Sequence, residues 1–319
     1  MDALYNAAKP RVVAIGGPTA TGKTALSVAL AKRFGGEIIS ADSMQIYQGL
    51  DVGTAKVTPE EMQGVPHHLV GFLAPEQAFS VADFTTLAGK TITQLTAQGK
   101  LPLVVGGTGL YITSLLNGIG FTPEKVDPAI RQELQARLQA EGSQALYAEL
   151  AAVDPGYAAK VHPNNTPRVI RALELYRATG RKMSAEREAA RPAENPYRSL
   201  CLCLTCRDRT LLYQRIDTRC DRMMQSGILE EAKLVYDHRD TYRTAAQAIG
   251  YKEFVDALDG RCTIEEAADL VRQSSRRYAK RQLTWFRRNK AIHWLIRDTG
   301  DTGREILENA RRIVSDFDN

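Results

Sequence analysis

A phosphate-binding loop occupies residues 17–24, which read Gly-Pro-Thr-Ala-Thr-Gly-Lys-Thr. An apolar, β-branched run from Arg11 to Ile15 precedes the loop, and a run rich in alanine and leucine from Ala25 to Ala31 follows it. This order predicts a strand, a glycine-rich loop and a helix. Glycines let several backbone N–H groups point into one concavity at the positive end of the helix, which is where phosphate oxygens bind. The loop therefore favours an α/β fold with a nucleotide-type or diphosphate-type ligand.

We expect every residue of the loop to contribute to phosphate binding. These residues are Gly17, Pro18, Thr19, Ala20, Thr21, Gly22, Lys23 and Thr24. The Lys23 ammonium adds a positive charge, and the Thr24 hydroxyl is a ligand for magnesium, so Mg²⁺ is the expected cofactor. A nucleoside triphosphate such as ATP is the default ligand, but a diphosphate on another carrier fits the loop equally well.

Two further strands are expected in the first 110 residues, over 36–40 and 101–105, with a helix over 81–97 between them. Apolar strands that alternate with helices are typical of a parallel sheet covered on both faces. Ligands of such sheets bind at the carboxyl ends of the strands. Asp42 and Thr108 follow two of these ends, so we expect both to share a crevice with the phosphate-binding loop.

Strand patterns disappear between about 117 and 194, where proline and glycine separate helical segments. These helices are expected over 127–140, 143–152, 166–179 and 184–190. The sheet resumes at 197–206, and helices over 208–224, 228–237, 245–258 and 263–289 follow. A strand over 292–296 and a helix over 303–316 end the chain. The prediction is a P-loop NTPase-like parallel core, residues 1–117 and 197–319, with an inserted all-helical domain, residues 118–196, and extra C-terminal helices.

The composition, 44% hydrophobic and 25% charged residues, is typical of a soluble globular protein. No run of 18 apolar residues predicts a membrane span, and residues 1–6 lack the pattern of a signal peptide. Cys201, Cys203 and Cys206 alternate with apolar residues as in a strand, which favours buried thiols over a metal site. We therefore expect a cytoplasmic protein with reduced cysteines and, as its assembly, a monomer.

The segment 270–293 carries eight basic residues and no acidic one, in a chain with a net charge of +5. Tyr278, Trp285 and Phe286 are interleaved with these charges. A one-sign helix with interspersed aromatic side chains is typical of a nucleic-acid surface. The alternative is a solvated basic face without a partner.

Asp42 is the candidate catalyst, although its position alone leaves three roles open: a magnesium ligand, a proton acceptor or a cap for the next turn. Seven segments together carry a resemblance to a known family. They are 42–47 (Asp-Ser-Met-Gln-Ile-Tyr), 51–56 (Asp-Val-Gly-Thr-Ala-Lys), 106–111, 162–164, 168–174, 249–251 and 280–287. In this order and over nearly the whole chain, they resemble the bacterial tRNA dimethylallyltransferases, also called tRNA isopentenyltransferases. One departure is Gly71, where an acidic residue is expected, and it puts one local hydrogen bond in doubt.

The resemblance implies transfer of a dimethylallyl group from dimethylallyl diphosphate to the exocyclic amine of the adenosine at tRNA position 37. The loop would hold the diphosphate, with Lys23 and a magnesium ion at Thr24 neutralising the leaving group. Arg215 or Arg219, four residues apart on one helix face, would supply another cation, unless they form surface ion pairs with Asp217 or Asp221. Asp42 would accept the amine proton and Thr108 would position the base.

The resemblance also implies contacts with the anticodon stem-loop of tRNA. The expected residues are Asp42, Ser43, Met44, Gln45, Thr108, Pro167, Arg168, Val169, Ile170, Arg171, Gln247, Gly250, Tyr251, Lys252, Lys280, Arg281, Gln282, Trp285 and Arg287. Two alternatives remain: a P-loop kinase of a small metabolite, and an isopentenyltransferase acting on free adenine nucleotides. A small substrate needs neither the inserted helices nor the basic C-terminal helix, which favours tRNA.

Overall fold

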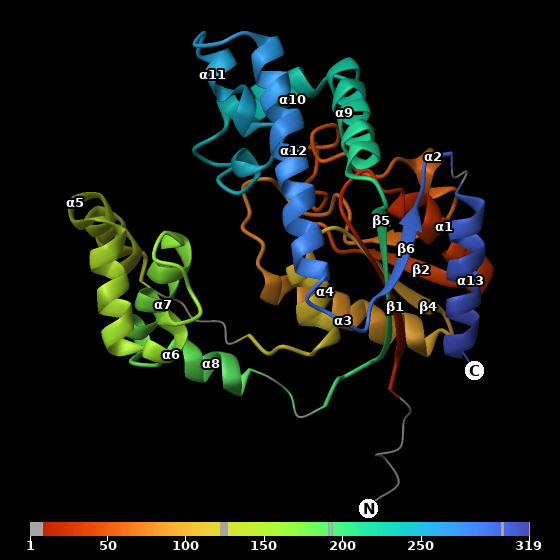
Figure 1. Ribbon diagram of the computed structural model, residues 1–319, viewed down its shortest axis with the longest axis horizontal. Coiled ribbons are helices and arrows are strands. Elements are labelled where there is room, and N and C mark those ends of the chain that lie inside the picture. Colours follow the sequence, from red (N-terminus) through yellow and green to blue (C-terminus); the bar gives the residue numbers. More distant parts are fainter. Residues whose placement is uncertain (1–8, 122–126, 191, 193, 301–302, 319) are drawn as a thin grey trace, which may run out of the picture. The chain divides into compact units, whose positions relative to one another are not determined.

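A computed structural model describes residues 9–121, 127–190, 192, 194–300 and 303–318 of the chain (Figure 1). The expectation for residues 1–6 lies outside the described residues. The chain divides into two compact units. The first comprises Met1–Leu116 and Pro196–Asn319, and the second is Asn117–Asn195. We describe each unit by itself.

The first unit is built on a six-stranded sheet in the order β3-β2-β4-β1-β5-β6, and all its strand pairs are parallel. The strands are β1 (Arg11–Gly16), β2 (Gly36–Ser40), β3 (His67–His68), β4 (Leu101–Val105), β5 (Arg198–Cys206) and β6 (His293–Arg297). The second unit interrupts the chain between β4 and β5, yet β1 pairs with both of these strands. The predicted parallel α/β class is confirmed.

Alternate residues of β1 face two separate hydrophobic layers, as the period of a strand requires. Val13 and Ile15 pack with α1 (Lys23–Phe34) and α13 (Arg304–Asp318). Val12 and Ala14 face the opposite layer, which contains α3 (Val81–Ala97) and α4 (Gly109–Leu116). Because the sheet is covered on both faces, only the ends of its strands remain open for a ligand.

The C-terminal helices of the first unit, which Figure 1 shows, contain a third hydrophobic cluster. These helices are α9 (Arg209–Gln225), α10 (Ile228–Asp237), α11 (Val255–Leu258) and α12 (Ile264–Phe286). The remaining described helix of this unit, the short α2 (Pro59–Met62), precedes β3 in the chain. Ile216 of α9, Val235 of α10 and Val271 of α12 meet in this cluster with Tyr47, from the segment after β2. The cluster therefore fixes the helices against the strand-end loops.

The second unit consists of α5 (Pro128–Val153), α6 (Pro155–Ala158), α7 (Thr166–Thr179) and α8 (Met183–Ala189). Leu134, Leu150 and Leu173 lie in its core. Gly142, with φ of 82°, interrupts the helical backbone inside α5, in agreement with the two helices that the sequence predicts there.

Several predicted boundaries agree with the structure to the residue, those of β2, α3, β4, α7 and α10. The single helix predicted over 245–258 is wrong. The chain forms two 3₁₀ turns there, Ala245–Gln247 and Lys252–Phe254, before α11. Gly250 adopts φ of 102° and donates its N–H to the Glu253 carboxylate, so it cannot continue a helix.

The cysteine-containing segment forms β5, as its alternation predicts. Burial raises the pKa of Cys201 to about 11 and that of Cys203 to about 12, so both remain thiols. Across the described part of the chain, no helix has the length and apolar character needed to cross a membrane.

Candidate active site

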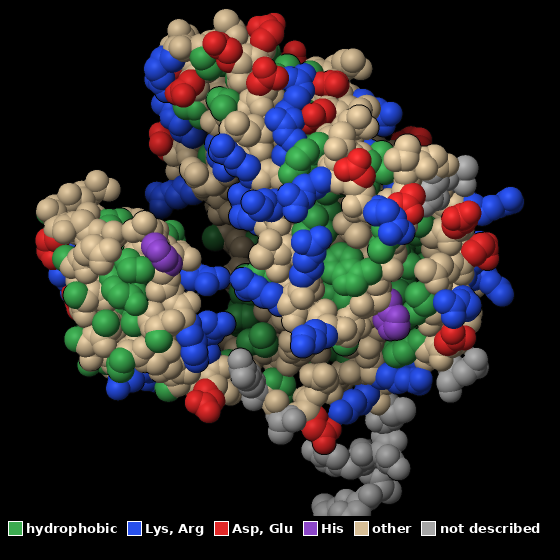
Figure 2. Space-filling view, viewed as in Figure 1, with side chains coloured by type: hydrophobic (Ala, Val, Ile, Leu, Met, Phe, Trp, Pro, Cys, Tyr) green, Lys and Arg blue, Asp and Glu red, His purple; other side chains and the backbone are tan. Residues whose placement is uncertain are grey.

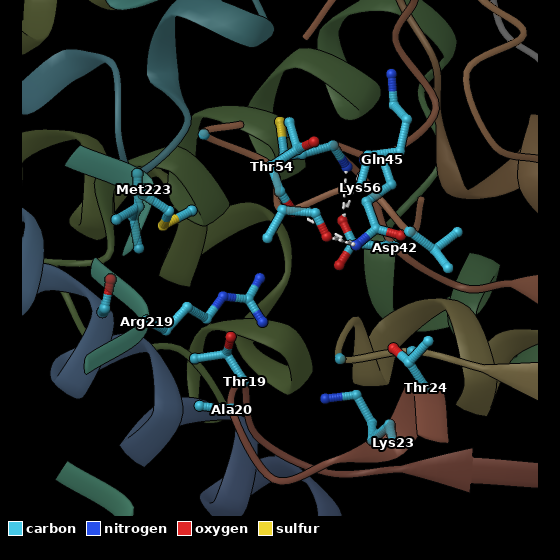
Figure 3. A pocket seen from close by; sticks show the side chains of 18 of the residues that line it. Thr19, Ala20, Lys23, Thr24, Asp42, Gln45, Thr54, Lys56, Arg219 and Met223 are labelled. Atoms are coloured by element: carbon cyan, nitrogen blue, oxygen red, sulfur yellow. Dashed lines mark hydrogen bonds between the residues drawn. The ribbon is translucent and has the colours of Figure 1, made fainter. Parts of the chain in front are cut away.

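A cleft of about 1070 Å³ opens in the first unit where β1, β2 and β4 end (Figure 3). The phosphate-binding loop, the turn after β2 and the segment 51–58 contribute to its walls, together with residues of α9 and α12. Lys23, Thr24, Asp42 and Arg219 all line it. The predicted convergence of the strand-end elements is therefore observed, although Gly106 and Gly107, and not the predicted Thr108, line the cleft after β4.

The phosphate-binding loop has the backbone that its glycines predict. Gly17 adopts φ of 135°, and a Cβ there would lie 2.5 Å from the Leu204 carbonyl oxygen, so no side chain fits. The Thr21 hydroxyl donates to the Pro18 carbonyl at 2.9 Å inside the loop. Ala20 has the unusual φ of 63°, and its carbonyl accepts a hydrogen bond from Arg215 Nε at 2.7 Å. Arg215 therefore supports the loop from α9.

Lys23 begins α1 and lies deep in the cleft. Its Nζ donates to the Pro18 carbonyl at 2.7 Å. Burial lowers the pKa of Lys23 to about 8; the Arg219 guanidinium lowers it further, whereas Asp42 raises it. Burial likewise lowers the pKa of Arg219. Two confined cations that disfavour each other's charge form a site that gains stability when an anion binds.

The two arginines of α9 are not equivalent. Arg215 Nε is held by the Ala20 carbonyl, whereas the Arg219 guanidinium extends into the cleft toward Lys23 and Asp42 (Figure 3). The alternative of surface ion pairs on α9 is wrong. Its two acids pair with α12 instead, as Asp217 lies 2.6 Å from Arg276 and Asp221 lies 2.6 Å from Arg272.

Asp42 caps the turn that follows it through one carboxylate oxygen and leaves the other oxygen unengaged. Oδ1 accepts the backbone N–H groups of Met44 at 2.9 Å and Gln45 at 3.3 Å, which stabilises the turn. Oδ2 accepts no hydrogen bond from any described residue, and the carboxylate faces the cleft (Figure 3). Thr108 lies beside this turn, because its Oγ1 accepts the Ser43 N–H at 3.2 Å.

Gln282 of α12 joins two of the site's loops. Its Nε2 donates to the Gly107 carbonyl at 2.9 Å, and its Oε1 accepts the Thr19 N–H at 3.1 Å. The side chain is buried. Gln282 is therefore engaged on both amide atoms by the protein, although the sequence predicted it as an RNA contact.

Tyr278 is a site residue that the sequence identified only as one of several interleaved aromatics. It lines the cleft one helical turn before Gln282. Burial raises its pKa to about 12, so the hydroxyl stays protonated. The sequence could have indicated this role, because Tyr278 and Gln282 are four residues apart and therefore lie on one face of the basic helix.

Trp285 of α12 lies against α4. Its indole N–H donates to Thr113 Oγ1 at 3.1 Å, and a Cβ on Gly109 would lie 2.3 Å from the indole ring. The Arg288 guanidinium stands 5.6 Å from the Trp285 ring centroid. Tyr278, under the Arg281 guanidinium at 5.5 Å, is the second partly exposed aromatic ring of this helix that is in contact with a cation.

The basic residues of 270–293 separate into two groups. Arg272 and Arg276 pair with acids, as described above. Within the described chain, no acid forms an ion pair with four of the remaining exposed cations, which are Lys280, Arg281, Arg287 and Arg288. Figure 2 shows Lys and Arg side chains gathered along α12. We call these four residues the basic surface.

The other predicted RNA contacts differ in exposure. Gln247 and Lys252 are exposed in the first unit, whereas Tyr251 is buried in its core. Val169 and Ile170 are buried in the core of the second unit. On that segment, only Pro167, Arg168 and Arg171 present exposed side chains, and Arg171 pairs with Glu174 at 2.9 Å.

The fold and the cleft define a class of protein: a P-loop α/β protein whose phosphate-binding loop and a carboxylate line one cleft at the strand ends. Comparison with known proteins narrows the class. The IPP transferase family matches residues 45–289, and the isopentenyl transferase family matches residues 10–70. The chain therefore belongs to the IPP transferase family, the tRNA dimethylallyltransferases, as the sequence motifs suggested, and hence to the prenyltransferases.

Individual relatives agree with this assignment. The chain is 50% identical over 289 residues to the tRNA dimethylallyltransferase of Bacillus subtilis, covering 91% of each. A crystal structure of a Bacillus halodurans tRNA isopentenylpyrophosphate transferase shares 46% identity, with a TM-score of 0.72 and 97% coverage of both chains. A eukaryotic dimethylallyltransferase acting on tRNA shares 29% identity, with a TM-score of 0.79 over 96% of this chain and 80% of that one.

Proposed function

We propose that this protein transfers a dimethylallyl group from dimethylallyl diphosphate to the exocyclic amine of adenosine at tRNA position 37. One observation carries the proposal: Lys23 and Arg219 line one cleft together with the Asp42 carboxylate (Figure 3). Cations suit a diphosphate leaving group, and a carboxylate suits the amine that loses a proton. The family to which the chain belongs supports the same reaction.

The donor diphosphate would lie on the phosphate-binding loop. Backbone N–H groups of the loop, Lys23 and Arg219 would stabilise the negative charge that develops as the allylic C–O bond breaks. The diphosphate leaves with the electron pair of that bond. Arg215 keeps the loop in place through Ala20 and is a second-best candidate for direct contact.

Magnesium fits this site as a partner of the diphosphate. The Thr24 hydroxyl lines the cleft at the start of α1 and makes no hydrogen bond to the described residues. No group of three or more acidic, histidine or cysteine side chains gathers as a metal site in the described chain. Mg²⁺ commonly binds through one protein ligand and substrate phosphates, so Thr24 and the diphosphate would hold it. Its charge would further neutralise the leaving group.

The acceptor amine would lie at Asp42. Its nitrogen lone pair forms the new bond to the allylic carbon, and Asp42 Oδ2 takes the proton that the nitrogen loses. The hydrogen bonds from Met44 and Gln45 fix the orientation of the carboxylate. Thr108, beside the Asp42 turn, and Tyr278, in the cleft lining, would border the base.

An adenosine in an anticodon loop must leave its stack to reach a cleft of this kind. We propose that the anticodon stem-loop binds through the basic surface on α12 and through the exposed Arg168 and Arg171 of the second unit. We further propose that the protein acts as a monomer in the cytoplasm, where its tRNA substrate resides. The basic surface favours an RNA substrate over a small metabolite or a free nucleotide.

Labelled dimethylallyl diphosphate incubated with the protein and either tRNA or AMP tests the proposal. Transfer of label to tRNA, and its loss when position 37 is changed from adenosine, is the expected result. Label on AMP instead would establish the free-nucleotide activity. If the protein instead released ADP from added ATP in an amount equal to a phosphorylated product, it would be a kinase of a small metabolite.

A further inference from the structure

Glu231 of α10 binds three consecutive backbone N–H groups of the segment 51–53. Its Oε2 accepts from Asp51 at 2.7 Å and from Val52 at 2.9 Å, and its Oε1 accepts from Gly53 at 2.7 Å. The Glu231 carboxylate is 178 to 180 residues away from them in the sequence. Hydrogen bonds to an ionised acceptor are about twice as strong as neutral ones, so these three bonds hold the segment 51–53 firmly against α10. We call this set of bonds the Glu231 anchor.

Tyr251 contacts both partners of the Glu231 anchor, the carboxylate and Gly53. Its hydroxyl donates to Glu231 Oε1 at 2.5 Å, and a Cβ on Gly53 would lie 2.3 Å from its ring. Burial and the Glu231 charge raise the pKa of Tyr251, so the hydroxyl remains a donor. Glu231 therefore receives four hydrogen bonds, and the segment 51–53 has no room to shift toward Tyr251.

The anchored segment continues into the wall of the cleft. The carbonyl oxygens of Thr54 and Ala55 accept from Gln45 Nε2, at 3.4 and 2.9 Å. The backbone N–H of Gln45 in turn donates to Asp42 Oδ1 at 3.3 Å. One chain of hydrogen bonds therefore runs from Glu231 through the segment 51–55 and Gln45 to Asp42.

We propose that Glu231 is a positioning residue for the acceptor half of the reaction, acting through Gln45 on the Asp42 carboxylate. The inference rests on the proposed function, because it assigns a support to the proposed proton acceptor. Glu231 lies outside the cleft lining and so has no direct contact with substrate. The donor half is supported separately, by Arg215 on Ala20 and by Gln282 on Thr19.

The packing of α10 does not depend on the Glu231 carboxylate. Ile228, Ala232 and Val235 hold the helix in the hydrophobic core. A substitution of Glu231 should therefore release the segment 51–55 while α10 stays in place. A misplacement of about 1 Å at a reacting group costs on the order of 100-fold in rate, so a loosened Asp42 should slow the transfer markedly.

Glu231→Gln is the test. The glutamine amide keeps the shape of the carboxylate, but it replaces one accepting oxygen with an N–H₂ group, which cannot accept hydrogen bonds from the backbone N–H groups. Glu230→Gln is the matched control, since Glu230 is exposed on the same helix. Single-turnover transfer to saturating tRNA should fall roughly 10- to 100-fold in Glu231→Gln, and it should be unchanged in Glu230→Gln. Binding of inorganic diphosphate with Mg²⁺ should be the same in both variants and in the wild type.

Two outcomes would overturn the inference: a Glu231→Gln rate equal to that of Glu230→Gln, or an equal loss of rate and of diphosphate binding, which indicates general disruption. If Glu231→Gln does not fold, Tyr251→Phe removes one of the four hydrogen bonds and should give a smaller loss of rate with diphosphate binding intact. A Tyr251→Phe rate equal to that of the wild type would then overturn it. A wild type that transfers no label to tRNA would instead refute the proposed function itself.

Discussion

Gln282 accepts a hydrogen bond from the backbone N–H of Thr19 at 3.1 Å, across 263 positions of the sequence. The same amide donates to the Gly107 carbonyl at 2.9 Å. A helix that carries the basic surface therefore also holds the phosphate-binding loop against the loop after β4. The proposed RNA surface on α12 and the proposed donor site at Thr19 are thereby joined through one buried side chain.

Gln282→Met should weaken the donor site and lower the thermal stability. The substitution keeps the volume but leaves the Thr19 N–H and the Gly107 carbonyl without their partner, at a cost of about 1–3 kcal/mol for each buried group. Calorimetric unfolding and the KM for dimethylallyl diphosphate measure the two effects. If only tRNA affinity changes, Gln282 contacts the RNA directly, as the sequence predicted.

Asp42→Asn should nearly abolish turnover and leave tRNA affinity almost unchanged. Asparagine retains Oδ1, so the hydrogen bonds from Met44 and Gln45 persist and the turn keeps its shape. Only the proposed proton acceptor is lost, and loss of a general base commonly costs on the order of 10²–10⁴ in rate. Single-turnover kinetics and RNA binding on the same preparation provide the measurement. A variant that retains most of the wild-type rate would show that another group takes the proton.

Lys23→Ala and Thr24→Ala should damage the use of the allyl donor. In the proposed function, Lys23 would supply charge to the diphosphate and Thr24 would supply the hydroxyl for magnesium. Steady-state kinetics with each substrate varied in turn, at several magnesium concentrations, test the two roles. Thr24→Ala should respond to added magnesium, whereas Lys23→Ala should not. Damage confined to the KM for tRNA would contradict the assignment of the loop to the donor.

Affinity for inorganic diphosphate should weaken as the pH rises through about 8. The folded state lowers the pKa of Lys23 from 10.5 to about 8, so the unliganded protein loses this charge in that range. Above it, binding must first take up a proton, which reduces the apparent affinity. Titration calorimetry between about pH 7 and about pH 9 measures the trend. The trend should be absent in Lys23→Ala, and its persistence there would assign the titration to another group.

Neutral substitution of the basic surface, Lys280, Arg281, Arg287 and Arg288 together, should weaken tRNA binding and leave diphosphate binding intact. Affinity falls as salt rises, and the slope of log K against the logarithm of the salt concentration reports the number of phosphate contacts. Each lost contact should make this slope shallower by roughly 0.7, the value for single-stranded nucleic acid. Salt titrations by fluorescence anisotropy provide the test.

The paired arginines of α12 supply the contrast to that experiment. Arg272→Gln and Arg276→Gln break ion pairs with α9, so they should affect stability more than the salt dependence. If neutral substitution of the basic surface leaves the slope of log K against log salt concentration unchanged, this surface does not contact the RNA. Arg168 and Arg171 would then be the next candidates for the interface.

The local features of this protein were readable from its sequence. The phosphate-binding loop, β2, α3, β4, α7 and α10 each follow from a short run of residues, because loop chemistry and the period of apolar residues act over a few positions. Asp42 was also found in this way, since the carboxyl end of a strand in a parallel sheet is a ligand position. The break at Gly250 was missed, because the alanines and apolar residues around it also fit a helix.

Tertiary structure alone decided which side chains support the site. Gln282 binds Thr19, and Glu231 binds the segment 51–53, through contacts that join residues more than 170 positions apart. It also decided that Arg219 extends into the cleft while Arg215 holds Ala20, although the two lie on one helix face. The sequence determined the motifs because they depend on local backbone preferences. It could not determine these partners, because they form only when distant elements pack around a common core.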